Sequence, residues 1–246
     1  MNRFFLESSQ FDGDRVIFPG EIAHQVIHVL RLTEGDKVEV LDNTCTAFEV
    51  ILINADQPEL VTGKIIGQRK IDSESSIKVS LFFGLTQRDK VEWILQKGTE
   101  LGLNAFYPFI SAHTRVTSVN MPDQKFDRWK RIIRESAEQS GRGLLPTLHQ
   151  PRKLDSCLDQ INQLEGRALA AWEAADPGTQ TIQEGLSGFS GSTIRLLIGP
   201  EGGFTKEEIQ QITNAGCWVV SLGRRILRME TAAIIFPALV MYELGE

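Results

Sequence analysis

The chain has 246 residues, with 26 Lys or Arg against 32 Asp or Glu and a net charge of −6. Its length fits one large domain or two small ones, and 41% hydrophobic content excludes disorder as the main state. The acidic balance argues at first against a nucleic-acid binder. The charge is uneven, however, because residues 71–153 hold 13 basic and 9 acidic residues, a net of +4. A localised nucleic-acid contact through this middle segment therefore stays open.

Targeting and metal signals are weak in this sequence. No apolar run approaches the roughly 18 residues of a membrane span, and the acidic N-terminus does not resemble a secretory signal. Cys45, Cys157 and Cys217 are odd in number and contain no C-x-x-C spacing, which favours free thiols in a reducing cytoplasm. His24 and His28 stand one helical turn apart without a third ligand. We therefore expect a cytoplasmic protein without a membrane segment or a metal site.

The first 70 residues are rich in predicted strands. Short runs of strand-forming residues, separated by Gly, Asn, Asp and Pro, lie at 15–18, 37–41, 47–53 and 60–66. One helix is predicted at about 21–32. This pattern indicates a small β-barrel, and the polar stretch 68–76 is the best candidate for a linker. The predicted organisation is a barrel over 1–70, a linker over 71–76 and a second domain over 77–246.

The second domain alternates apolar strands with helices. Nearly continuous apolar strands are predicted at 77–83, 105–110, 168–172, 194–198 and 217–222. The intervening helices include one over 89–101, one that begins at Asp123, and one that opens with a capping box at Thr205 and Glu208. Such alternation predicts an α/β fold with a parallel sheet that is covered on both faces.

The final helix, at about 230–244, is apolar around most of its circumference. A surface helix would show a single apolar stripe. This helix therefore needs cover on more than one side, either from the same chain or from a second subunit.

Two loops carry the strongest functional signal. Residues 197–204 read Leu-Ile-Gly-Pro-Glu-Gly-Gly-Phe and link a buried strand to a capped helix, where glycines let a ligand approach the backbone. Residues 222–232 read Leu-Gly-Arg-Arg-Ile-Leu-Arg-Met-Glu-Thr-Ala, an arrangement that suits an apolar ring with cations facing outward. No Walker phosphate loop, dinucleotide-binding fingerprint, nucleophile elbow or zinc-protease motif is present.

These two motifs together resemble the signature of the RsmE family, the ribosomal RNA small-subunit methyltransferases E, which belong to the SPOUT (knotted) methyltransferases. The resemblance extends over the whole chain. It includes the N-terminal His24 with Val29-Leu-Arg31, the helix segment Lys97-Gly-Thr-Glu-Leu-Gly102, and Ala137-Glu-Gln-Ser-Gly-Arg142 after Trp129. The paired loop motifs are very specific, whereas the N-terminal segments alone would be weak.

The resemblance implies a PUA-like RNA-binding barrel at the N-terminus and a homodimeric SPOUT domain with a C-terminal trefoil knot. It also implies S-adenosyl-L-methionine as the methyl donor. The implied acceptor is N3 of one uridine in the 16S rRNA of the small ribosomal subunit. No metal is needed, because the positive sulfur already activates the methyl group.

The resemblance, together with the chemistry of the donor and the acceptor, assigns site residues. The candidates for donor binding are Trp172, Glu173, Leu197, Ile198, Gly199, Glu201, Gly202, Gly203, Leu222, Gly223, Ile226, Leu227, Met229, Thr231 and Ala232. The candidates for catalysis at uracil N3 are Arg228, Glu230, Glu138 and Arg142, without an assignment of the base. Glu138 and Arg142 are four residues apart, so an ion pair on a helix surface is the competing interpretation. The expected RNA contacts are Arg3, Arg31, Arg88, Arg115, Arg131 and Arg134.

Two other functions stay open at this point. A SPOUT methyltransferase that modifies another RNA, such as a tRNA, would use the same donor motifs. A ribosome-binding factor without enzymatic activity could also retain the donor fold. Binding of S-adenosylmethionine separates the last hypothesis from the first two.

Overall fold

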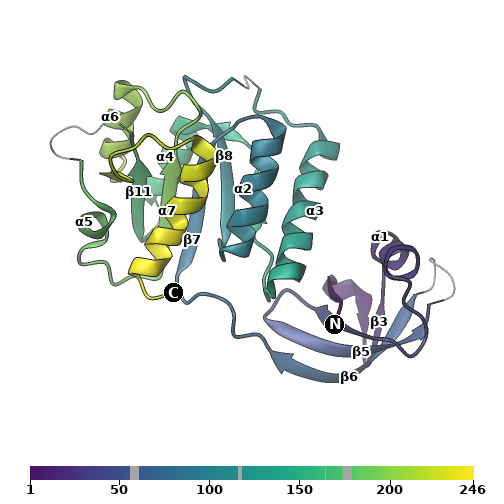
Figure 1. Cartoon of the computed structure of the whole chain (residues 1–246). Coiled ribbons are helices and arrows are strands. Elements are labelled where there is room, and N and C mark those ends of the chain that lie inside the picture. The colour runs from purple at the N-terminus through teal and green to yellow at the C-terminus, as the bar shows by residue number, and fades with distance from the viewer. Residues whose placement is uncertain (56–60, 116–117, 164, 174–178) are drawn as a thin grey trace. The chain divides into compact units, whose positions relative to one another are not determined.

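The computed structural model describes all residues except 56–60, 116–117, 164 and 174–178. The chain folds into two compact units (Figure 1). The first contains residues 1–74 together with 137–145, and the second contains residues 75–136 and 146–246. The segment 137–145, which lies within the second domain of the sequence prediction, belongs to the first unit.

The first unit is built on a curled, mostly antiparallel sheet of six strands in the order β1-β4-β5-β6-β3-β2, in which only the β1–β4 pair is parallel. Its elements are β1 (Arg3–Phe5), η1 (Ser8–Gln10), β2 (Phe11–Asp12), β3 (Arg15–Ile17), α1 (Gly20–His24), η2 (Gln25–Val29), β4 (Lys37–Leu41), β5 (Thr46–Asn54) and β6 (Thr62–Lys70). Strand β6 extends through the start of the polar stretch 68–76. The helix predicted at 21–32 ends earlier in the structure. Helix α1 continues directly into η2, a π-helical segment that ends at Val29.

The second unit contains a seven-stranded sheet in which every described pair is parallel. The strand order is β10-β8-β7-β12-β11-β13, with β9 beside β8. Its elements are β7 (Lys78–Gly84), α2 (Arg88–Glu100), β8 (Ala105–Ile110), α3 (Asp123–Ser140, whose last four residues belong to the first unit), β9 (Thr147–Leu148), β10 (Arg152–Lys153), α4 (Leu154–Gln163), β11 (Arg167–Ala171), α5 (Ile182–Leu186), β12 (Thr193–Ile198), α6 (Lys206–Asn214), β13 (Trp218–Val220) and α7 (Met229–Glu243). The predicted α/β class with a parallel sheet is confirmed.

Helices cover both faces of this sheet, as the alternation of its buried side chains requires. On strand β12, Ile194, Leu196 and Ile198 pack with residues of α2, α3, α5 and α7, and Leu197 packs on the other side with residues of α4 and α6. In Figure 1, α2, α3 and α7 lie in front of the sheet. The predicted capping box is confirmed: the Thr205 hydroxyl accepts from the backbone N–H of Glu208, and the Glu208 carboxylate accepts from the backbone N–H of Thr205.

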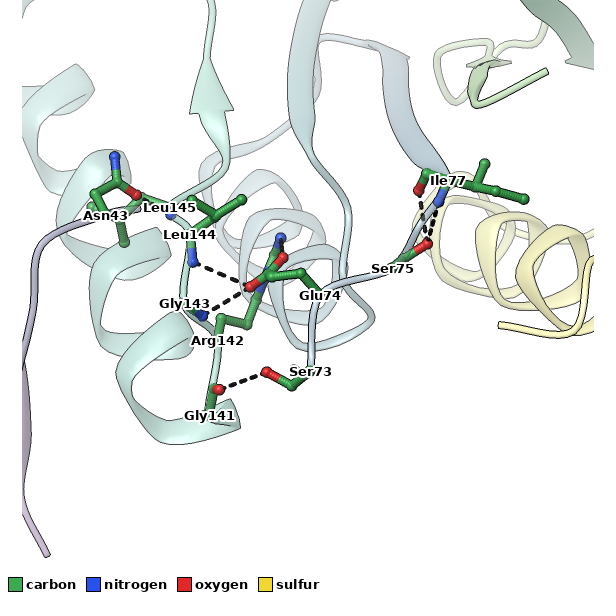
Figure 2. A network of polar contacts seen from close by, with 10 residues as sticks. All are labelled: Asn43, Ser73, Glu74, Ser75, Ile77, Gly141, Arg142, Gly143, Leu144 and Leu145. Carbon is green, nitrogen blue, oxygen red and sulfur yellow. Dashed lines mark hydrogen bonds and ion pairs between the residues drawn. The ribbon is translucent and has the colours of Figure 1, made fainter. Parts of the chain in front are cut away.

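A buried polar network fastens the end of α3 within the first unit (Figure 2). The Arg142 guanidinium donates to both oxygens of the Glu74 carboxylate, at 2.7 and 3.3 Å. The same carboxylate accepts from the backbone N–H groups of Gly143 and Leu144, at 2.9 and 3.1 Å. The Ser73 hydroxyl donates to the carbonyl of Gly141. Residues 73–74 thereby hold the loop that follows α3.

The Glu74 carboxylate is ionised in this network. Burial opposes its ionisation, but the hydrogen bonds and charge of Arg142 and the two backbone N–H groups outweigh burial, so the pKa lies below its ordinary value of 4.5. Because the pKa is lowered on folding, the pair stabilises the folded state above that ordinary value. The stabilisation is lost as the pH falls through the lowered pKa.

We expect Glu74→Gln to lower the free energy of unfolding by about 3 kcal/mol at pH 7, because the buried Arg142 guanidinium loses its charged partner at 2.7 Å. The difference from the unsubstituted protein should shrink as the pH falls below 4.5. Urea titrations at pH 7 and pH 3 measure both effects, and Glu135→Gln, at an exposed position on α3, is the control. A difference that stays constant over this range would contradict the ionised pair.

Candidate functional site

Three loops meet at one edge of the parallel sheet of the second unit. They follow β11, β12 and β13, whose carboxyl ends are level because Ala171 pairs with Ile198 on one side and with Val220 on the other. Parallel strands end at the same edge, so their following loops converge there. Between the loops lies a cavity of about 520 Å³.

Most of the predicted donor-binding residues line this cavity. Those in its wall are Trp172, Glu173, Ile198, Gly199, Glu201, Gly203, Leu222, Gly223, Ile226, Leu227, Met229 and Ala232. Three of the fifteen lie elsewhere. Leu197 is buried in the core on the face of α4 and α6, the Cα of Gly202 faces His113, and Thr231 is exposed on the first turn of α7.

Glycine is required at Gly203 by both conformation and space. Its φ of +68° lies in the left-handed region, which disfavours residues with a Cβ. A Cβ at this position would also run into the carboxylate of Glu173. Glycine at 203 therefore suits the left-handed backbone of loop 199–203 and leaves room for the Glu173 carboxylate of the neighbouring loop.

The loop after β12 is also packed tightly against the end of β7. A Cβ on Gly84 would lie 2.5 Å from the backbone nitrogen of Pro200. The neighbouring strands β7 and β12 are in register up to Phe83 and Ile198. This close contact fixes where the glycine-rich loop leaves the sheet.

A charged cluster occupies one side of the cavity. The Lys90 ammonium, on the first turn of α2, donates a short hydrogen bond to Glu201 and lies 3.5 Å from the carboxylate of Glu230. Glu201 also accepts from the Thr86 hydroxyl at 3.1 Å and lies 3.7 Å from the Arg115 guanidinium. Lys90 thus joins the loop after β12 to the start of α7.

These contacts shift the affinities of both groups for protons. The hydrogen bond from Lys90 is the main cause that lowers the pKa of Glu201, and the Thr86 hydroxyl and the charges of Lys90 and Arg115 act in the same direction. The hydrogen bond to Glu201 is likewise the main cause that raises the pKa of Lys90. The ionised pair is therefore the stable form at neutral pH.

The loop 222–230 supplies an apolar wall and a cationic rim. Leu222, Leu227 and Met229 line the cavity together with Ile226, whose side chain is 79% exposed. Arg225 and Arg228 also line the cavity and are exposed, and Arg228 immediately precedes α7. An apolar surface with cations at its edge is the arrangement expected from the sequence of this loop.

The four predicted catalytic residues do not lie together in one unit. Arg228 and Glu230 line the cavity in the second unit. Arg142 and Glu138 belong to the first unit, where Arg142 binds Glu74 and Glu138 accepts from the backbone N–H of Phe5 at 3.0 Å.

The predicted RNA-binding arginines are also distributed. In the first unit, Arg3 is mostly buried and pairs with Glu39 at 2.6 Å, and Arg31 is exposed with a positive φ. In the second unit, Arg115 is exposed beside the cavity, whereas Arg88 pairs with Glu92 at 2.8 Å. On α3, Arg131 is exposed and Arg134 is half-buried.

Lys90 and Gln87 also line the cavity, although neither is among the donor-binding residues predicted from the sequence. Both residues follow a predicted strand, as the motif loops do, so the sequence placed them at the same edge of the sheet. The sequence did not indicate the strand order, which places β7 directly beside β12.

The part of the chain that the structure describes contains neither a metal-binding cluster nor a membrane-spanning helix. No group of three or more His, Cys, Asp or Glu side chains is placed to hold a metal ion there. The rings of His24 and His28 contact each other, with centroids 4.7 Å apart. Within the same described residues, no helix is both long and apolar enough to span a bilayer.

Comparison with known proteins places the chain among RNA-modifying enzymes. Residues 73–241 match the model of the RNA methyltransferase domain family. The ribosomal RNA small subunit methyltransferase E of Bacillus subtilis is 31% identical over 99% of this chain and 97% of its own length.

Solved structures show the same fold. A ribosomal RNA small subunit methyltransferase E from Neisseria gonorrhoeae, bound to S-adenosyl methionine, matches with a TM-score of 0.85 and 27% identity over 98% of this chain and 97% of its own. A putative methyltransferase from Legionella pneumophila, also in complex with S-adenosyl methionine, matches with a TM-score of 0.86 and 26% identity over 98% of this chain and 96% of its own.

Proposed function

This chain belongs to the ribosomal RNA small subunit methyltransferase E family, and we propose that it transfers a methyl group from S-adenosylmethionine to N3 of a uridine in 16S rRNA. The observation that carries the proposal is the convergence of three motif loops on one cavity. Twelve of the fifteen residues that the sequence assigned to the donor line that cavity.

The cavity fits the chemistry of the donor. Its apolar residues, Ile198, Leu222, Ile226 and Leu227, suit an adenine ring, and its glycines admit a ligand to backbone groups. Its carboxylates, Glu173, Glu201 and Glu230, suit the positive charges of the amino acid end and the sulfonium. When bound, the donor supplies a methyl group that is already activated by positive sulfur, so these residues need only bind and orient it.

The acceptor side requires stabilisation of negative charge. Uracil N3 becomes a good nucleophile when it loses its proton, and the resulting charge spreads to O2 and O4. We assign Arg228, at the rim of the cavity, to that charge. Glu230 holds Lys90 beside the donor site. For Arg142 and Glu138 we propose a supporting role within the first unit, because their described contacts are made there.

RNA binding is proposed for both units. The curled sheet of the first unit is consistent with a PUA-like barrel that holds a structured RNA element by shape. In the second unit, Arg115 and the exposed Arg131 of α3 are suited to phosphate contacts, which set register without reading sequence.

We further propose that the C-terminal part of the second unit forms a trefoil knot. The strand order supports this, because β11 lies between β12 and β13 and the chain then returns as α7 to pack on β12 and β7. Such a return brings loop 222–228 beside the two earlier loops.

Homodimer formation is proposed through α7 and its neighbour α2. Four large apolar side chains remain exposed on these two packed helices: Trp93, Ile235, Leu239 and Tyr242. The sequence of the last helix predicts cover on more than one side, and in the single chain one side is left open to solvent. A second copy would bury this surface.

Gly203→Ala should weaken S-adenosylmethionine binding at least tenfold, roughly 1.4 kcal/mol, because the new Cβ would displace the Glu173 carboxylate, which lines the cavity. Calorimetric titration measures the change. Gly216→Ala is the matched control, since Gly216 also has a positive φ, of +81°, but lies away from the cavity with open space around it. Equal losses of affinity in the two variants would contradict the proposed donor pocket.

The purified protein should convert one uridine of 16S rRNA to 3-methyluridine in the presence of S-adenosylmethionine. Incubation with small ribosomal subunits, free 16S rRNA and tRNA, followed by mass spectrometry of the nucleosides, tests this. Modification of tRNA alone would overturn the assigned substrate, and failure to bind the donor would overturn the enzymatic function.

Leu239→Arg should convert the proposed dimer to a monomer, because a charge would replace an apolar side chain at the centre of the interface. Sedimentation equilibrium would then report half the mass of the unsubstituted protein. Ile17→Arg, at a similarly exposed apolar residue of the first unit, serves as the comparison and should leave the mass unchanged. A monomeric unsubstituted protein would refute the interface.

A further inference from the structure

A second hollow adjoins the donor cavity. It has a volume of about 380 Å³ and is lined by His113, Arg115, Glu201 and Gly202. Arg115 and Glu201 line both spaces, so the hollow opens beside the cavity and shares part of its wall. Glu201 and Gly202 belong to the glycine-rich motif and Arg115 is a predicted RNA contact, whereas no sequence motif indicates His113.

The turn that carries His113 is held by specific hydrogen bonds. The backbone N–H of Ser111 donates to the Thr114 hydroxyl at 2.9 Å, and the backbone N–H of Thr114 donates to the carbonyl of Ser111 at 3.1 Å. The backbone N–H of Ala112 donates to the buried carboxylate of Glu208 at 2.8 Å. Glu208 also closes the capping box of α6, so the turn is fastened to the start of a helix.

The contacts of His113 define its tautomer. Its Nδ1 lies 2.8 Å from the carbonyl oxygen of Gly202 and 3.2 Å from that of Gly203. Carbonyl oxygens only accept hydrogen bonds, so Nδ1 carries the proton. In the neutral ring, Nε2 is then the unprotonated nitrogen, and it makes no hydrogen bond to any residue that the structure describes. The same contact holds the glycine-rich loop of the donor cavity.

The carboxylates near the hollow are poorer candidates for accepting a proton. Glu201 has a lowered pKa because Lys90 donates to it, with further contributions from Thr86 and Arg115. An ionised carboxylate that is paired with a cation binds a proton weakly. Nε2 of His113, by contrast, has a lone pair to which no described residue donates.

We propose that the second hollow takes the target uracil ring and that His113 is the general base that removes its N3 proton. This inference rests on the proposed function. The N3–H bond breaks and its proton passes to Nε2 of His113. The electron pair left on N3 forms the bond to the methyl carbon. The carbon–sulfur bond breaks as this bond forms, and its electrons return to sulfur, which becomes a neutral thioether.

Arg115 complements His113 in this assignment. Its guanidinium is 77% exposed, and its nearest described carboxylate is that of Glu201, at 3.7 Å. It therefore retains donors for one of the two uracil oxygens, O2 and O4, which flank N3 and carry the negative charge when N3 loses its proton, and Arg228 of the adjoining cavity is assigned to the other. An acceptor at Nε2 beside a cationic donor matches the hydrogen-bonding edge of uracil.

The first experiment compares His113→Asn with His113→Gln in single-turnover methylation of small ribosomal subunits. The Asn amide occupies the place of Nδ1, so it keeps the contact with Gly202 and Gly203 but has no base at Nε2. We expect His113→Asn to bind S-adenosylmethionine within threefold of the unsubstituted protein and to transfer the methyl group about 100-fold more slowly. His113→Gln should be equally slow, because it also lacks a base.

The pH profile separates a catalytic role from a structural one. The rate of the unsubstituted protein should fall on the acid side as the imidazole is protonated, whereas that of His113→Asn should rise with hydroxide without this inflection. Among the described residues, the other charged groups that line the hollow or bond the turn are Arg115, Glu201 and Glu208, and both proteins retain them. A His113→Asn rate within threefold of the unsubstituted rate, or a profile with the same inflection, would overturn the proposal.

Nitrogen NMR of the protein without ligands gives a test that does not depend on activity. With ¹⁵N-labelled histidine, Nδ1 of His113 should show the signal of a protonated nitrogen and Nε2 that of an unprotonated one at pH 8. The opposite tautomer would overturn the assignment. If the unsubstituted protein binds the donor but forms no 3-methyluridine in any RNA, the proposed function fails, and the NMR result still decides the tautomer.

Discussion

The parallel register of β11, β12 and β13 is the constraint on which the candidate site depends. Ala171 faces both Ile198 and Val220, so the three strands end level with one another. Each strand is followed by a loop that bears part of the donor signature. A shift of one strand by two residues would move its loop by about 6–7 Å and open the wall of the cavity. The glycines of loop 199–203 also help to form the cavity, because they allow this loop to lie close to its neighbours.

The charged groups of the site have different proposed roles, and their ion pairs explain why. Lys90 pairs with Glu201, whose pKa it lowers, so this carboxylate stays ionised in the cavity wall, and the Glu230 carboxylate lies 3.5 Å from the same ammonium. A fixed negative wall favours a cationic ligand and disfavours proton transfer to the same carboxylates. The proposed separation of roles follows from this arrangement: acidic residues for the donor, and an imidazole with a defined tautomer for the acceptor. In the first unit an ion pair has a structural role, because the pairing of Arg142 with Glu74 fixes the end of α3.

Sequence patterns predicted the α/β architecture and most of the donor cavity. Apolar strands such as β7 and β12 were recognisable because strands that are buried on both faces need continuous apolar residues. The capping box of α6 was recognisable because its hydrogen bonds join residues three apart. Patterns were less informative where contacts are distant in sequence. Glu138 and Arg142 are spaced as a helical pair, and their side chains also bind Phe5 and Glu74, 133 and 68 residues away, which no local pattern indicates.

The sequence by itself determined the class of fold, the two loops with specific motifs and, through those motifs, the family. These features depend on local periodicity and on residues that are close together in the chain. Only the tertiary structure decided which residues meet around the cavity. Strand order placed Lys90 beside Glu201 across 111 residues, and the turn at 111–114 brought His113 to the carbonyls of Gly202 and Gly203. No local pattern encodes such meetings, because they depend on the order of strands in the sheet and on the register between them.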